Sequence, residues 1–181
     1  MALVVLIGAS GSGKTTIARA IAARPGLAAK VFHFDSIGVP SPAEMARRHG
    51  SGEAWQRATT IEWMLRLARE VEAGAPVLFE GQTRFSFLAE GAAAAGSLAY
   101  LPILIDCDDD ERSRRLRFER EQPELAGEEM MNWARHLRRE ARRGGHQILD
   151  TTALPLVDSV ERVLASWPGC KGAASSCRPS R

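Results

Sequence analysis

A loop near the start of the chain carries the residue types and spacing of a phosphate-binding site. It reads Gly8-Ala9-Ser10-Gly11-Ser12-Gly13-Lys14-Thr15 and fits the pattern G-x-x-x-x-G-K-[ST]. Its glycines would let successive backbone N–H groups turn inward, onto an anion held at the positive end of the following helix. We expect Lys14 to reach the terminal phosphates of a nucleotide and the Thr15 hydroxyl to bind Mg²⁺. The residues expected to contact the nucleotide here are Gly8, Ser10, Gly11, Ser12, Gly13, Lys14, Thr15 and Thr16.

Two acidic residues come directly after apolar runs that are typical of buried strands. Asp35 follows residues 31–34 and Glu80 follows residues 77–79. Ligands of open α/β sheets gather at the carboxyl ends of the strands, so both acids are well placed for chemistry. Asp35 could accept a proton from a substrate hydroxyl, orient that substrate, or cap the next turn. Glu80 could hold Mg²⁺ through water or serve as an ordinary cap, and we expect His33 to be packed or exposed, not catalytic.

Arginines are concentrated between positions 112 and 143. A helix with interleaved Glu and Arg is usually a solvated face of i, i+4 pairs, such as Glu111 with Arg115. The run nevertheless holds more arginine than such pairing needs, and the planar guanidinium suits phosphate. The candidates to reach nucleotide phosphates are one or two of Arg112, Arg115, Arg117 and Arg120.

Hydrophobic periodicity indicates strands that alternate with helices. The expected strands are 3–7, 31–34, 77–79, 98–105 and 146–149, and the expected helices are 16–23, 53–73, 85–95, 109–121, 128–143 and 156–167. This alternation predicts an α/β fold with a parallel sheet covered on both faces, although it does not determine the strand order. Pro102 cannot donate to a ladder, so the fourth strand either starts after it or places it where no donor is needed.

Composition is typical of one soluble globular domain. The chain has 181 residues, of which 45% are hydrophobic and 25% charged, and its net charge of +2 is too small to indicate nucleic-acid binding. Its three cysteines lack disulfide or zinc spacing, which favours a reducing cytosol. No apolar stretch is long enough to span a bilayer, so we expect a cytoplasmic protein. The Gly-, Ser- and Pro-containing tail, 168–181, is expected to be disordered.

The order of these motifs resembles that of the P-loop small-molecule kinases, the group that includes adenylate, shikimate and gluconate kinases. Residues 80–84, Glu-Gly-Gln-Thr-Arg, are similar to the Asp-Gly-x-x-Arg signature whose arginine touches the acceptor's phosphate in adenylate kinases. Asp150-Thr151-Thr152 resembles the loop that packs on adenine, and Arg135 resembles an arginine that returns from the lid. The likeness covers residues 3–167 in the order of their elements and is sharp only at these short motifs.

The resemblance implies a three-layer fold with five parallel strands in the order 2-3-1-4-5. It implies one kinase domain at 1–167, an acceptor-binding insert at 36–74 and a short, metal-free lid at 120–128. It also places Arg115 and Thr151 in contact with the nucleotide. The catalytic residues that it implies are Lys14, Asp35, Arg84 and Arg120. Trp55, Trp63 and Trp133 would flank the acceptor cleft, either as core residues or in contact with a planar substrate.

We therefore expect an Mg²⁺-requiring kinase that transfers the γ-phosphoryl group of ATP to a small metabolite, acting as a monomer or homodimer. Arg84 favours a phosphorylated acceptor such as a nucleoside monophosphate, whereas Asp35 favours a hydroxyl acceptor. The alternatives are a nucleotide-binding ATPase or regulatory module without an acceptor, which would need a positioned water, and a less favoured kinase of RNA ends.

Overall fold

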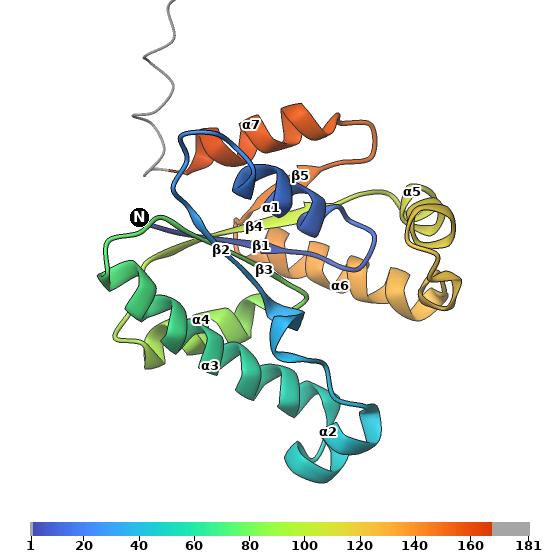
Figure 1. Ribbon diagram of the computed structural model, residues 1–181. Helices are drawn as coiled ribbons and strands as arrows, with labels where there is room; N and C mark the ends of the chain where they lie inside the picture. The colour runs from blue at the N-terminus through green and yellow to red at the C-terminus, as the bar shows by residue number, and fades with distance from the viewer. Residues whose placement is uncertain (1, 168–181) are drawn as a thin grey trace, which may run out of the picture.

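The computed structural model describes residues 2–167, which form one parallel sheet with helices on both faces (Figure 1). The predicted disordered tail lies outside the described residues. The strands are β1 (Leu3–Ile7), β2 (Lys30–His33), β3 (Val77–Gly81), β4 (Tyr100–Asp106) and β5 (Gln147–Asp150). They are all parallel and lie in the order β2-β3-β1-β4-β5, which confirms the order implied by the resemblance.

The helical elements lie close to the predicted ranges. The α-helices are α1 (Lys14–Ala22), α2 (Pro42–His49), α3 (Gly52–Glu72), α4 (Phe85–Ala94), α5 (Asp109–Arg114), α6 (Glu128–Arg143) and α7 (Leu156–Ser166). Shorter turns are the 3₁₀ turns Phe34–Ile37 and Pro123–Leu125 and the π-helical turn Arg115–Glu119. The predicted helix 109–121 is therefore divided into α5 and the π-helical turn.

The sheet separates two hydrophobic layers. Alternation along β1 sends Leu3, Val5 and Ile7 to one side, where they pack with residues of α3, α4 and α6. Val4 and Leu6 face α1 and α7 on the other side. Every residue of β1 is wholly buried, so the strand that leads into the glycine loop cannot shift without disturbing both layers.

Pro102 lies inside β4, where one neighbouring strand has not yet begun. β4 pairs with β1 from Tyr100 onward, but its pairing with β5 starts only at Ile103. The missing N–H of proline is tolerated at such a partly unpaired position. The second of the two sequence-based alternatives is therefore the correct one.

The insert between β2 and β3 is a helical arm. α2 and α3 extend from the sheet at its β2 side, with α2 at the far end (Figure 1). Ser41 begins α2 with a capping box to Glu44, and the Ser51 hydroxyl accepts from the Ala54 amide at the start of α3. These caps fix where each helix begins.

Gly81, at the end of β3, should be a packing-sensitive position. A Cβ there would lie 2.6 Å from Phe34 Cβ, whereas a Cβ on Gly52, the first residue of α3, would meet only Met45 Sδ at 3.6 Å. We expect Gly81→Ala to lower the free energy of unfolding by about 1–3 kcal/mol through this overpacking. Chemical denaturation would measure it, with Gly52→Ala as the control that should not destabilise the protein. Equal effects of the two substitutions would contradict the packing described here.

Candidate active site

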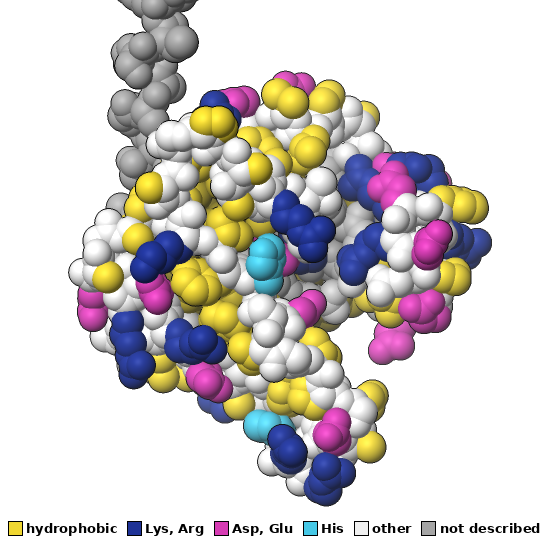
Figure 2. Space-filling model, viewed as in Figure 1, with side chains coloured by type: hydrophobic (Ala, Val, Ile, Leu, Met, Phe, Trp, Pro, Cys, Tyr) yellow, Lys and Arg dark blue, Asp and Glu magenta, His cyan; other side chains and the backbone are white. Residues whose placement is uncertain are grey.

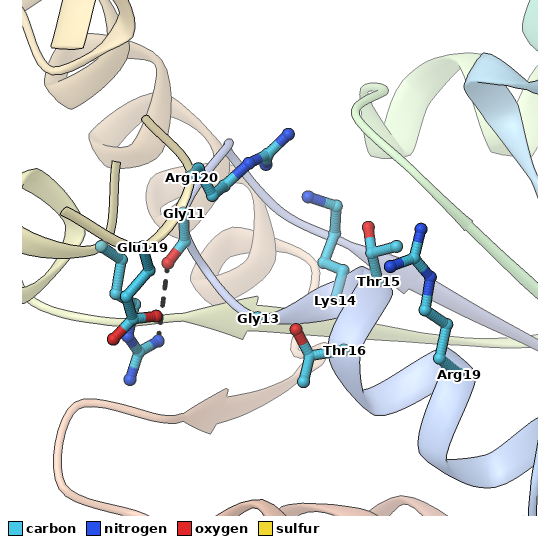
Figure 3. A pocket seen from close by; sticks show the side chains of 9 residues that line it. Gly11, Gly13, Lys14, Thr15, Thr16, Arg19, Glu119 and Arg120 are labelled. Atoms are coloured by element: carbon cyan, nitrogen blue, oxygen red, sulfur yellow. Dashed lines mark hydrogen bonds between the residues drawn. The ribbon is translucent and has the colours of Figure 1, made fainter. Parts of the chain in front are cut away.

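The glycine loop and the first turn of α1 form one wall of a cavity of about 220 Å³ (Figure 3). The opposite wall comes from the π-helical turn and the residue after it. Two groups of side chains thus face each other across the cavity. The wall from α1 holds Lys14, Thr15, Thr16 and Arg19, and the opposite wall holds Arg115, Glu119 and Arg120. The first N–H groups of α1 have no partner within the helix, so they are available to an anion there. In the space-filling view a hollow separates the α5 region from the arm of α2 and α3 (Figure 2).

Side chains hold the carbonyl side of the loop. The Ser10 carbonyl accepts from Arg112 Nη1 at 3.0 Å, and the Ser12 carbonyl accepts from Thr151 Oγ1 at 2.9 Å. The Gly11 carbonyl accepts from Arg115 Nη1 at 3.5 Å. Because these carbonyls are engaged on one side, the loop can present its N–H groups to the other.

Gly8 is required by close backbone approach. A Cβ at this position would lie 2.3 Å from the carbonyl oxygen of Ile105, on the neighbouring strand β4. The Ser12 side chain is wholly buried beneath the loop, and its Oγ has no hydrogen-bond partner. Ser10 Oγ instead donates to Gln82 Oε1 at 3.2 Å, which ties the loop to the residues after β3.

Lys14 is buried at the cavity, with 7% of its surface exposed. Its Nζ donates to the carbonyl of Ala9 at 3.1 Å, within the loop itself. Burial lowers the pKa of Lys14 to about 8, while the Glu80 carboxylate acts in the opposite direction. A phosphate group in the cavity would supply the negative charge that this ammonium lacks.

Thr15 and Glu80 bring two oxygen atoms together beside the loop. Thr15 Oγ1 donates to Glu80 Oε1 at 3.1 Å, and the same carboxylate oxygen lies 2.8 Å from His33 Nδ1. Mg²⁺ prefers oxygen ligands such as a hydroxyl and a carboxylate, and phosphate oxygens and water usually complete its coordination shell. Within residues 2–167 no group of three or more His, Cys, Asp or Glu side chains could hold a metal ion by itself. The pair therefore fits Mg²⁺ that arrives with a nucleotide.

His33 makes a contact that the sequence-based reasoning did not predict. We expected it to be packed or exposed and not catalytic; its side chain is 34% exposed, and its ring is hydrogen-bonded to Glu80. The reason is strand register: His33 of β2 pairs with Glu80 of β3, so the two side chains share one face of the sheet. Periodicity within one strand could not show this pairing.

Asp35 lies in the 3₁₀ turn directly after β2, near the same edge of the sheet. Partial burial raises the pKa of the Asp35 carboxyl, as does the nearby Glu80 charge, whereas Lys14 and Arg120 act in the opposite direction. Asp35 thus lies close enough to these three side chains to share their electrostatic field.

The arginines of the run have different environments. Arg112 is wholly buried and paired with Asp106, whereas Arg117 is exposed. Arg115 donates to the Thr151 carbonyl at 2.7 Å and to its hydroxyl at 2.9 Å. Thr151, at the end of β5, is buried and braces the glycine loop. Of the four arginines proposed to reach phosphates, only Arg115 and Arg120 line the cavity at the glycine loop.

A second cavity, of about 610 Å³, lies between α3 and α6. Arg84 lines it and donates to Glu53 Oε2 at 3.0 Å, and its guanidinium lies 5.5 Å from the Trp133 ring centroid. Gln82 also lines this cavity, so its hydrogen bond to Ser10 connects the cavity wall to the glycine loop. Trp133 borders the cavity, whereas Trp55 and Trp63 are core residues.

Comparison with solved structures decides the fold. A sugar kinase from Janibacter sp. HTCC2649 is 21% identical, with a TM-score of 0.62 over 91% of this chain and 92% of that one. A gluconokinase from Sinorhizobium meliloti 1021 is 18% identical, with a TM-score of 0.60 over 91% and 90%. Shikimate kinase from Acinetobacter baumannii, solved with shikimate, is 16% identical, with a TM-score of 0.53 over 92% of each chain.

The chain has the P-loop small-molecule kinase fold. No protein-family model and no curated protein sequence matches it. The P-loop of this fold is the glycine loop described above, and the 2-3-1-4-5 sheet places it at the centre of the carboxyl edge. None of the described helices is both long and apolar enough to cross a membrane.

The lowered pKa of Lys14 predicts that nucleotide binding to the P-loop depends on pH. Because that pKa is about 8 in the free protein and bound phosphate would raise it, binding takes up a proton above pH 8. In EDTA, we expect the affinity for ADP to be level near neutral pH and to fall by up to about tenfold per pH unit above the pKa. Isothermal titration calorimetry would measure it.

The matched variant is Lys14→Met, which should bind ADP weakly and without this pH dependence. Calorimetry in buffers of different ionisation enthalpy would count the proton directly. An affinity that stays level through the pKa in the wild-type protein would contradict the placement of Lys14 at the phosphates.

Proposed function

We propose that this protein is an Mg²⁺-requiring kinase that transfers the γ-phosphoryl group of ATP to a hydroxyl group of a small metabolite. The observation that carries the proposal is the convergence of Lys14, the Thr15–Glu80 pair and Asp35 at the carboxyl edge of the sheet. The likeness to a sugar kinase, a shikimate kinase and a gluconokinase supports the same reaction class.

The donor side of the reaction would be the P-loop cavity. Phosphoryl transfer depends on alignment and on neutralising charge at the oxygens of the moving group. Lys14 and the N–H groups at the start of α1 would bind the β- and γ-phosphates. Arg120, across the cavity, would add positive charge, and Arg115 and Thr151 would border the nucleoside end.

Thr15 and Glu80 would hold Mg²⁺, which when bound would neutralise part of the charge on the phosphates. His33 would keep the Glu80 carboxylate oriented through its hydrogen bond. Thr15 Oγ1 and Glu80 Oε1 lie beside the glycine loop, so the protein and the nucleotide would both supply ligands to the metal.

The acceptor would bind in the second cavity and extend its reacting hydroxyl to Asp35, which lines neither cavity but follows β2 at the carboxyl edge of the sheet. Asp35 would orient the acceptor hydroxyl and accept its proton, because a raised pKa makes its carboxylate a stronger base. Arg84 Nη2 already donates to Glu53, whereas its buried Nε has no partner in the described structure. The hydroxyl assignment therefore rests on Asp35, and Arg84 would bind a polar group of the acceptor. Segment 120–128 would act as the lid.

Substitution of Asp35 should separate catalysis from nucleotide binding. We expect Asp35→Asn to lower kcat for a hydroxyl acceptor by about 10²–10⁴-fold, because the proton acceptor is lost. Mg·ATP affinity should change by less than about threefold, since Asp35 does not line the P-loop cavity. Coupled-assay kinetics and calorimetry would measure the two quantities. Asp158→Asn, at an exposed position of α7, is the matched control.

A screen of hydroxyl and phosphorylated acceptors with purified protein and Mg·ATP tests the proposed reaction. Turnover that depends on a hydroxyl acceptor would support it. Rapid ATP hydrolysis that no acceptor stimulates would instead support an ATPase or regulatory module. Preference for nucleoside monophosphates, with Arg84→Ala chiefly raising their KM, would overturn the hydroxyl assignment.

Glu80→Gln should raise the Mg²⁺ concentration needed for half-maximal activity by about tenfold, because an amide replaces the only carboxylate of the proposed metal pair. Titration of activity with Mg²⁺ at fixed ATP would measure this. Glu90→Gln, in the middle of α4 and paired with Arg57, should leave the Mg²⁺ requirement at its wild-type level. An unchanged requirement in Glu80→Gln would contradict the metal assignment.

A further inference from the structure

Arg112 is a charged side chain buried immediately behind the P-loop. It lies on α5 and has no exposed surface, although guanidinium groups are seldom fully buried. Burial of a charge is costly unless it is paired and hydrogen-bonded, and an apolar side chain of similar size would avoid that cost. The position of this arginine therefore calls for an explanation beyond packing.

The contacts of Arg112 join the P-loop to the end of β4. Its Nη1 donates to the Ser10 carbonyl at 3.0 Å, while its Nη2 donates to Asp106 Oδ1 at 2.6 Å and to the Cys107 carbonyl at 3.1 Å. The loop packs directly on its side chain, because a Cβ on Gly11 would lie 3.1 Å from Arg112 Cγ. The two Nη atoms thus connect the Ser10 carbonyl to a buried carboxylate.

Asp106 has a second guanidinium partner. Its other oxygen, Oδ2, accepts from Arg138 Nε on α6 at 2.5 Å, and Arg138 Nη2 donates to the Cys107 carbonyl at 3.2 Å. Two guanidinium groups thus share one carboxylate behind a loop suited to polyphosphate. Arg112 and Asp106 are buried, so their charges are weakly screened, whereas Arg138 is 28% exposed and also close to Asp109 and Asp150, which partly offset its charge. Arg138 itself does not line the P-loop cavity.

We propose that Arg112 is a positioning residue for the P-loop, anchored by Asp106 and supported through it by Arg138. Arg112 holds the Ser10 carbonyl away from the phosphates, which keeps the loop N–H groups directed at them. The two guanidinium groups add positive charge behind the loop, which favours phosphate binding. This role rests on the proposed function only in requiring that a nucleotide occupies the loop.

Calorimetric titration with Mg·ATP, Mg·ADP and adenosine tests the role, because a purely structural residue would affect all three ligands alike. Arg112→Lys keeps the charge but loses the fork that reaches both partners. We expect it to raise the Kd for Mg·ATP by about tenfold, with a smaller loss for Mg·ADP and less than about twofold for adenosine.

Arg138→Gln extends the test to a residue outside the loop, and it is the milder variant if Arg112→Lys does not fold. We expect it to raise the Kd for Mg·ATP by about threefold, again with a loss that grows with the number of phosphates. Arg139→Gln is the matched control, because it removes the same charge from an exposed position of α6 and should change the Kd by less than about 1.5-fold.

Equal losses for adenosine and Mg·ATP, or an effect of Arg138→Gln no larger than that of Arg139→Gln, would overturn the positioning role. These measurements need no turnover, so they remain decisive if no acceptor is phosphorylated and the proposed kinase activity fails. A wild-type chain that does not bind Mg·ATP would overturn both proposals.

Discussion

The candidate nucleotide site depends on the orientation of a short stretch of backbone, residues 9–12. Its carbonyl oxygens at residues 10, 11 and 12 accept hydrogen bonds from Arg112, Arg115 and Thr151 in turn, and Lys14 binds the carbonyl of residue 9 from the cavity. A peptide group whose oxygen is held on one side presents its neighbours' N–H groups to the other. Three of these donors come from distant parts of the chain, so the loop conformation is a tertiary property.

The sheet makes this arrangement possible by gathering strand ends at one edge. β1 is buried on both faces and carries the P-loop, and its neighbours β3 and β4 end beside it with Glu80 and Asp106. Register then decides which side chains meet, as it does for His33 and Glu80. Close packing of Gly81 on Phe34 fixes the turn that carries Asp35. The positions of the proposed metal ligands, Thr15 and Glu80, and of the proposed general base, Asp35, thus follow from the pairing and packing of the strands.

Much of the fold could be predicted, because its signals are local. Apolar runs marked the five strands, and helical periodicity marked α3 and α6 nearly to their ends. The strand order came from the resemblance, since periodicity carries no information on neighbours. The helix over 109–121 was predicted as continuous, but it changes to a π-helical turn at Arg115. This turn places Arg115 and Arg120 at the cavity, while Arg112 points into the protein.

The amino-acid sequence by itself determined the P-loop, the alternation of strands and helices, and the acids at the strand ends, because each depends on residues close together in the chain. Only the tertiary structure decided which arginines face the cavity, which tryptophans are core, and that His33 meets Glu80. Those outcomes depend on strand register and on buried charge pairing between residues far apart in sequence. The Arg112–Asp106 pair shows the reason: six positions separate the two residues, but the Ser10 carbonyl that completes their arrangement is about a hundred residues away.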